Sequence, residues 1–169
     1  MKLMTLTLPV LLGSVLLNAQ QASPALSKTK EVEVYFRYEN NGGPLVSGEL
    51  YTLTRRVSKT APLQGALAAL VSRTTAEEEN LGYQSAAYVE GMQLKSARIK
   101  RGIVYAHFTR PPIQGSPPDM ASLKFEEAVI KTAKRFPGVR KVVVCVNGMN
   151  EFGIGVVEDA PRRCPKEVK

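Results

Sequence analysis

The sequence is poor in the side chains that bind metals or activate nucleophiles. It contains one histidine and two cysteines in 169 residues, and these three cannot supply the four protein ligands of a structural zinc site. It also lacks a Gly-rich phosphate loop, a dinucleotide fingerprint, a G-x-S-x-G turn and a Ser-x-x-Lys signature. The sequence therefore predicts a protein without a cofactor or a metal.

A catalytic interpretation would have to use His107 or the acidic run Glu77–Glu79. His107 as a general base would need a nucleophile or substrate within hydrogen-bond reach. The acidic run could supply carboxylates for hydrolysis of wall glycans, but runs of charge usually face solvent. We therefore predict a protein that is not an enzyme, and keep a wall hydrolase using His107 as the weakest alternative.

Long apolar runs are missing except at the N-terminus. Met1-Lys2 precedes an apolar stretch, Leu3–Leu17, that Pro9 and Gly13 interrupt. This stretch is too short and too broken for a membrane span, and it is typical of a signal peptide. We expect a signal peptide over residues 1–25, cleaved after Ala19, Ala22 or Ala25, and a linker over 26–30. The mature protein is then exported, periplasmic or extracellular, and associated with the cell envelope.

Export changes the expectation for Cys145 and Cys164. An even number of cysteines in an oxidising compartment favours a disulfide, which would stabilise the fold by about 3 kcal/mol. In the alternative interpretation, Cys145 is a small buried residue and Cys164 is a free thiol on the tail.

Acidic residues are few relative to basic ones, 15 against 23, and the formal net charge is +8. Such a protein can contact anionic lipid, wall polymer or nucleic acid. Export and the absence of a base-reading motif argue against nucleic acid. A solvated basic surface is the alternative to a binding role. The candidate contacts to a polyanion are Arg55, Arg56, Arg98, Lys100, Arg101, Arg140 and Lys141.

The first half of the chain predicts two strands and a helix. Residues 31–38 alternate between apolar and polar side chains, as in a half-buried strand, and residues 50–57 give a second strand. A helix follows from Pro62 to about Val71, with Ser58 or Thr60 as its expected cap. Residues 75–93 are expected to form an irregular connection, either a surface loop or a short extra turn.

The second half repeats this order. Residues 94–100 and 103–108 flank Arg101-Gly102, which suits a two-residue hairpin turn. A helix over 120–136, capped by Asp119, ends before Pro137-Gly138, and the apolar run Val142–Val146 predicts a central strand. The order ββαββαβ predicts an α+β domain over residues 31–157, with a mixed sheet and both helices on one face. A basic tail follows over 158–169.

Four segments carry a resemblance to a known family. They are Val34–Phe36, Tyr51–Val57, Leu81–Leu94 with the following Arg101-Gly102 turn, and Phe136–Gly148. In this order and spacing the chain resembles the GerMN domain family, the sporulation and spore-germination module of secreted and envelope proteins. The resemblance covers about residues 31 to 152. It implies no catalytic residue, and it implies action by packing against other protein chains. After the hairpin the chain departs from the family at His107-Phe108-Thr109.

Two surfaces are candidates for a protein partner. Leu123 and Ile130 lie two turns apart on the expected outer side of the second helix, where they could dock a partner helix or a second copy, unless the Pro-rich loop or the tail covers them. The open face of the sheet would present Tyr35, Tyr105 and His107. We therefore predict an interaction or assembly module in the cell envelope, bound to an envelope protein or to itself. Binding to an anionic wall polymer or membrane surface is the second hypothesis.

Overall fold

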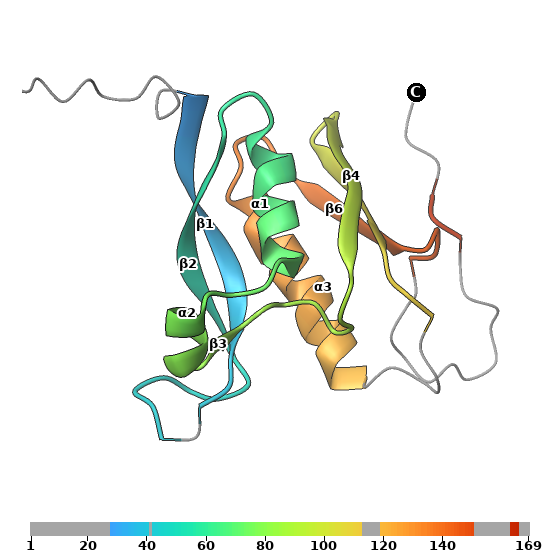
Figure 1. The fold of residues 1–169 in the computed structure, drawn as a ribbon. Helices are drawn as coiled ribbons and strands as arrows, with labels where there is room; N and C mark the ends of the chain where they lie inside the picture. The colour runs from blue at the N-terminus through green and yellow to red at the C-terminus, as the bar shows by residue number, and fades with distance from the viewer. Residues whose placement is uncertain (1–27, 41, 113–118, 151–162, 166–169) are drawn as a thin grey trace, which may run out of the picture.

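The computed structural model describes residues 28–40, 42–112, 119–150 and 163–165 (Figure 1). The predicted α+β class and the order ββαββαβ are confirmed. The elements are β1 (Thr29–Tyr38), β2 (Leu50–Ser58), α1 (Pro62–Val71), α2 (Ala76–Asn80), β3 (Tyr83–Gln84), β4 (Gln93–Lys100), β5 (Ile103–Thr109), α3 (Asp119–Lys134) and β6 (Lys141–Val146). The short elements α2 and β3 lie in the connection expected to be irregular, and β1 begins inside the expected linker. The predicted signal peptide and most of the predicted tail lie outside the described residues.

The strands form two three-stranded sheets and not one continuous sheet. In the first, the order is β2-β1-β3 and both pairs are antiparallel. In the second, the order is β4-β5-β6, with β4 antiparallel and β6 parallel to β5. Each sheet therefore starts from one long antiparallel strand pair, in agreement with the expected repeat of two strands and a helix.

The expectation that Val142–Val146 forms a central strand is wrong for the described part of the chain, where β6 is the last strand of its sheet: it pairs along its length with β5, and its other edge makes a single bridge, from Val146 to Met149. Val144 and Val146 face the core, while Cys145, on the opposite face, is only 1% exposed. An all-apolar strand indicates that both of its faces are covered, but it does not indicate that both of its edges are paired.

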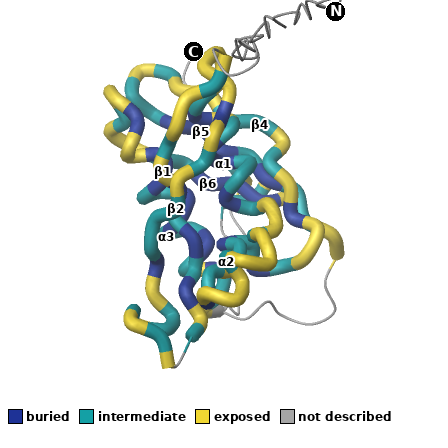
Figure 2. Tube along the Cα trace, turned by 60° about the vertical axis from the view of Figure 1, so that its left-hand side comes forward, coloured by how far each residue is buried: buried dark blue, intermediate teal, exposed yellow. Residues whose placement is uncertain are grey.

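Helices α1 and α3 pack against each other and join the two sheets around one core. In Figure 1 they lie between β1 and β2 on one side and β4 and β6 on the other. Their buried stripes are Leu63, Ala66, Leu67 and Leu70 on α1, and Phe125, Ala128, Val129 and Ala133 on α3. Figure 2 shows buried positions where these elements meet and exposed positions over α2. Burial of a leucine or phenylalanine contributes about 1.5–3 kcal/mol, so these stripes hold the two halves together.

Part of the edge of β1 is covered by α3. The Tyr35 amide donates to Thr132 Oγ1 over 3.1 Å, and Thr132 is fully buried. A hydroxyl on a helix thus satisfies a backbone donor that a neighbouring strand would satisfy in a wider sheet. No described helix is both long and apolar enough to cross a bilayer.

The helix ends differ from the expected ones. The N-cap of α1 is Ala61, and no side chain caps it, because Ser58 and Thr60 hydrogen-bond to each other and Pro62 leaves one amide fewer to satisfy. Helix α3 ends at Lys134. Its last turn is tightened by hydrogen bonds from the Arg135 and Phe136 amides to the carbonyl oxygens three residues earlier in the chain. Gly138 is left-handed, as predicted. The side chain of Asp119, the expected cap of α3, lies outside the described residues.

Candidate binding surfaces

Cys145 and Cys164 form a disulfide, as predicted. It ties the tail to the outer face of the β4-β5-β6 sheet, where the Cys164 amide also donates to the Gly148 carbonyl over 2.9 Å. A ring nitrogen of His107 lies within 4.8 Å of both sulfurs, because His107 on β5 is the register partner of Cys145 on β6. A disulfide offers no thiolate, so these residues hold no metal while the bond is intact.

The three residues predicted for the open sheet face do not form one surface. Tyr35 lies on β1 in the other sheet, under the cationic groups of Lys131 and Arg135 at 5.6 and 5.9 Å from its ring. Tyr105 is only 2% exposed, and His107 is half-buried beside the disulfide. The structure places Tyr105 and His107 together on β5 and separates them from Tyr35.

The outer side of α3 carries one of the two predicted aliphatics. Leu123 is 45% exposed, whereas Ile130 is half-buried and packs against the core. Met120, one turn before Leu123, is 67% exposed. The ion pairs Lys124–Glu127 and Lys131–Glu127 lie on the same helix. The exposed apolar surface of α3 is therefore Met120 with Leu123, and the sequence pattern alone did not single out Met120.

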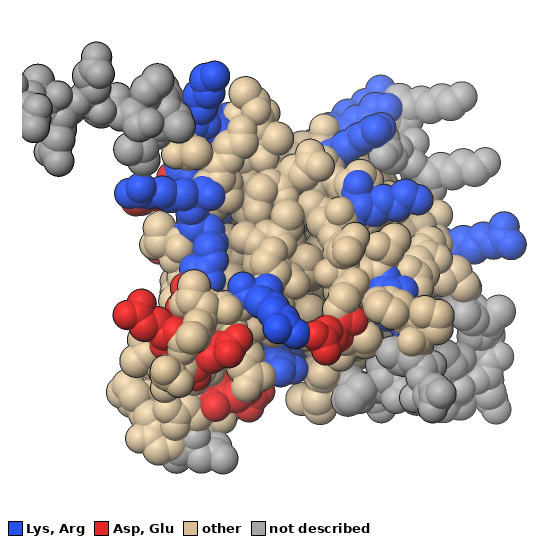
Figure 3. Space-filling view, viewed as in Figure 1, with Lys and Arg blue, Asp and Glu red and all other residues tan. Residues whose placement is uncertain are grey.

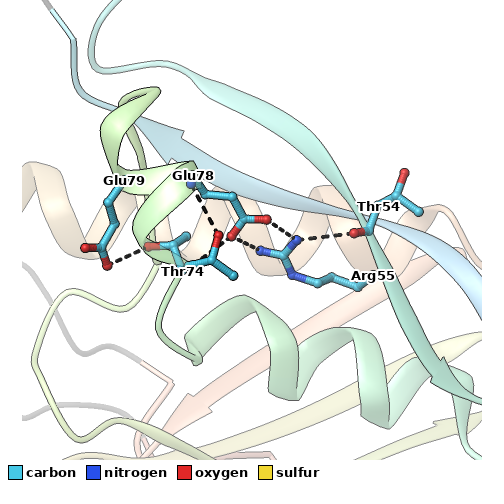
Figure 4. A network of polar contacts seen from close by, with 6 residues as sticks. Thr54, Arg55, Thr74, Glu78 and Glu79 are labelled. Carbon is cyan, nitrogen blue, oxygen red and sulfur yellow. Dashed lines mark hydrogen bonds and ion pairs between the residues drawn. The ribbon is translucent and has the colours of Figure 1, made fainter.

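Arg55 and Arg56, predicted as polyanion contacts, are engaged in ion pairs within the protein. The two terminal nitrogens of Arg55, Nη1 and Nη2, donate to the Glu78 carboxylate over 2.7 and 2.8 Å (Figure 4). The Arg55 guanidinium also lies 4.4 Å from the Phe36 ring centre. Arg56 pairs with Glu31. Burial alone would raise the pKa of Glu78, but hydrogen bonds from Arg55 and Thr75 and the charge of Arg55 hold this pKa below its usual value.

The acidic run Glu77–Glu79 forms most of α2. Thr75 and Glu78 cap this helix reciprocally, each side chain accepting a hydrogen bond from the other residue's amide, and Glu79 accepts from the Thr74 hydroxyl (Figure 4). The spacing of Thr75 and Glu78 is the sequence signature of a capping box, which could have predicted the helix. Glu78 and Glu79 therefore have structural partners.

A groove of about 670 Å³ lies between the end of α1 and residues 84–92. Its lining includes the ion pair Arg73–Glu90 and the hydroxyl of Ser85. Ser85 donates to the Leu70 carbonyl and accepts from the Ala87 amide. The lining has neither His nor Cys, and its two carboxylates already have partners: Glu79 accepts from the Thr74 hydroxyl and Glu90 pairs with Arg73.

The other predicted polyanion contacts lie on the β4-β5-β6 sheet. Lys100, Arg101, Arg140 and Lys141 come together at the β4–β5 turn and the adjacent start of β6. Arg98 is the register partner of Tyr105 on β5. Figure 3 shows cationic side chains over this turn, while acidic side chains gather over α2 at the opposite end of the molecule.

The comparisons with known proteins agree with this fold. Residues 33–151 match the profile of the Germane family, described as sporulation and spore germination. The chain belongs to this family. The resemblance of the sequence to GerMN domains is thereby confirmed, and no curated protein matches the chain significantly.

Two solved structures are similar to this Germane domain. One holds the tandem GerMN domains of the sporulation protein GerM from Bacillus subtilis, with a TM-score of 0.54 and 22% identity, over 83% of this chain and 47% of that one. The chain thus spans about half the length of that structure. The other is the first GerMN domain of the same protein, with a TM-score of 0.51 and 17% identity, over 82% of this chain and 99% of that one. At these identities the similarity shows the fold.

Proposed function

We propose that this Germane domain is a non-catalytic binding module of the cell envelope that docks on another protein chain. The description of its family names sporulation and spore germination and does not name a reaction. His107, the residue on which a wall-hydrolase interpretation depends, lies beside disulfide sulfurs, which cannot give up a proton to a base. The intact disulfide and the N-terminal signal-like stretch support export.

The observation that carries this proposal is the exposed apolar pair Met120 and Leu123. They lie one turn apart on α3 and are 67% and 45% exposed, next to ion pairs that keep the following turns of the helix charged. Two adjacent apolar side chains at the start of such a helix suit the centre of a protein contact. The partner is an envelope protein or a second copy of the chain.

Cross-linking in the native envelope tests this proposal. Leu123→Asp should lower the yield of cross-linked product at least about fivefold, because a carboxylate cannot be desolvated in an apolar contact. Leu81→Asp is the matched control, since Leu81 is 63% exposed but lies at the end of α2. Ile130→Asp should instead lower the stability of the domain, because Ile130 packs against the core.

Equal losses of cross-linked product for Leu123→Asp and Leu81→Asp would contradict a contact at α3. A chain that is strictly monomeric at high concentration and yields no cross-linked partner would overturn the proposal as a whole.

A further inference from the structure

Cations gather at the end of the molecule where β1 begins. This basic end comprises Lys28, Lys30, Lys59, Lys100, Arg101, Arg140 and Lys141. Its parts adjoin one another: the Lys59 amide donates to the Lys28 carbonyl, Lys30 lies 5.6 Å from the Phe136 ring centre, and the Arg140 amide donates to the Gly102 carbonyl. In Figure 1 the start of β1 and the β4–β5 turn lie at the same end.

These seven cations have no ion pair with an acidic residue in the described part of the chain, whereas the acids beside them are already paired. Glu31 binds Arg56, and Glu33 binds Arg135. The acids of α2 lie at the opposite end (Figure 3). The described acidic residues therefore do not neutralise the positive charge of the basic end, which remains available to an anionic ligand.

Hydrogen bonds hold the cations of the turn in place. Arg101 and Gly102 have φ angles of +52° and +76°, as in a tight two-residue hairpin turn. The amides of Arg140 and Lys141 both donate to the Gly102 carbonyl, and Arg140 Nη2 donates to the Arg101 carbonyl over 2.8 Å. Because the turn is fixed to the start of β6, a ligand need not order the backbone that carries these charges.

An apolar side chain lies among these charges. Ile99, directly before Lys100, is 46% exposed. An exposed aliphatic side chain next to Lys100 and Arg101 in the sequence suits the interfacial region of a bilayer, where it can enter the acyl boundary while the cations meet headgroup phosphates. A hydrated anionic polymer offers no apolar region in which the exposed Ile99 side chain could be buried.

The connectivity favours the same surface. The apolar stretch Leu3–Leu17 precedes Thr29, where β1 begins, by about a dozen residues of sequence. The chain that connects them reaches the domain at the basic end. Before the expected signal peptide is cleaved, insertion of that stretch into a membrane would thus bring this end of the domain toward the bilayer.

We propose that the basic end is a docking surface for an anionic phospholipid bilayer, with Lys100, Arg101, Arg140 and Lys141 at the headgroup phosphates and Ile99 at the acyl boundary. This surface is separate from Met120 and Leu123 on α3, so it does not rest on the protein contact proposed above. The two surfaces together would let the domain hold a partner chain while lying on a membrane.

Vesicle flotation of the full chain tests the proposal. Vesicles of phosphatidylglycerol with phosphatidylcholine are compared with phosphatidylcholine alone, since the difference isolates the headgroup charge from any insertion of the apolar stretch. Each cation near an anionic leaflet strengthens binding roughly fivefold, so Lys100→Gln with Lys141→Gln should weaken binding to anionic vesicles about 25-fold. Salt at about 1 M, with a Debye length of roughly 3 Å, should abolish the difference between the two vesicles.

The control is Arg73→Gln with Lys95→Gln, which removes two exposed cations, one just after the end of α1 and one near the start of β4, away from the β4–β5 turn. It should leave binding within about twofold of the unaltered chain. Ile99→Ser should weaken binding several-fold without changing its salt dependence. Unchanged circular dichroism and urea midpoints show that each variant is folded.

Three results would overturn the proposal. They are equal weakening by the two double variants, no preference of the unaltered chain for anionic vesicles, and retention on an isolated anionic wall polymer with no binding to vesicles.

Discussion

At the scale of single residues, Gly102 is the position on which the geometry of the basic end depends. Its φ of +76° is unfavourable for any side chain, and a Cβ there would lie 2.7 Å from Arg140 Nε and 2.9 Å from the Gly138 carbonyl oxygen. Backbone strain and a clash with a fixed carbonyl therefore act together. We expect Gly102→Ala to lower the free energy of unfolding by about 2–3 kcal/mol in urea denaturation.

Gly48 provides the control for this prediction. Its φ is +84°, but a Cβ there would have no atom within 4 Å. Gly48→Ala should therefore cost only the backbone strain, about 1 kcal/mol. If the two substitutions cost the same, the close approach of β6 to the turn does not contribute to stability.

At the scale of elements, α2 shows how a helix can persist without a core. It has five residues, none of them buried, and its structure rests on the capping box and on the two hydrogen bonds that Arg55 of β2 donates to the Glu78 carboxylate. We expect Glu78→Gln to lower the free energy of unfolding by about 1–2 kcal/mol at neutral pH, because both the cap and the charged bond weaken.

The pH dependence of stability distinguishes the contact between Glu78 and Arg55 from an ordinary surface charge. The pKa of Glu78 is lower in the folded protein than in the unfolded chain, so its contribution is complete above the usual carboxyl pKa and is lost as the pH falls through the folded-state value. Glu78→Gln should remove this part of the acid destabilisation. Glu79→Gln, which removes a charge from the same helix but leaves Arg55 paired, should retain it, and a flattened acid profile in the control would argue against the assignment.

At the scale of the whole molecule, the Cys145–Cys164 disulfide closes the chain onto its own sheet. The cysteines are 19 residues apart, and Cys145 is buried in β6 while Cys164 lies on the tail. Cys164→Ser should lower the free energy of unfolding by about 3 kcal/mol. Reductant should destabilise the unaltered protein to a similar level and have no effect on the variant. Urea curves that do not change with reductant would show that the tail is held by other contacts.

Across the whole molecule, the predictions from the sequence that were correct are those that depend on local signals. The alternation in residues 31–38, the Arg101-Gly102 turn and the Pro137-Gly138 stop each reflect local rules of backbone and burial, and each matches the structure. The capping box of α2 was also present in the sequence as Thr75 and Glu78. Local signals of this kind need no knowledge of distant contacts, since they act within a few residues.

Other expectations depended on which distant residues meet, and local signals carry no information about that. Nothing near Arg55 in the sequence shows that Glu78, 23 residues later, will neutralise its charge. Arg140, in contrast, lies at the Arg101-Gly102 turn, where no described acidic residue forms an ion pair with it. Likewise, Tyr35 and Tyr105 have similar strand patterns but belong to different sheets.

By itself, the sequence determined the order of the longer strands and helices, the excess of basic over acidic residues and the pair of cysteines, because these follow from local periodicity and composition. Only the tertiary structure decided how the strands divide into two sheets, which cations are paired and which remain at the basic end. Those outcomes depend on packing and on ion pairs between residues far apart in the chain, where the geometry of the folded backbone selects the partners.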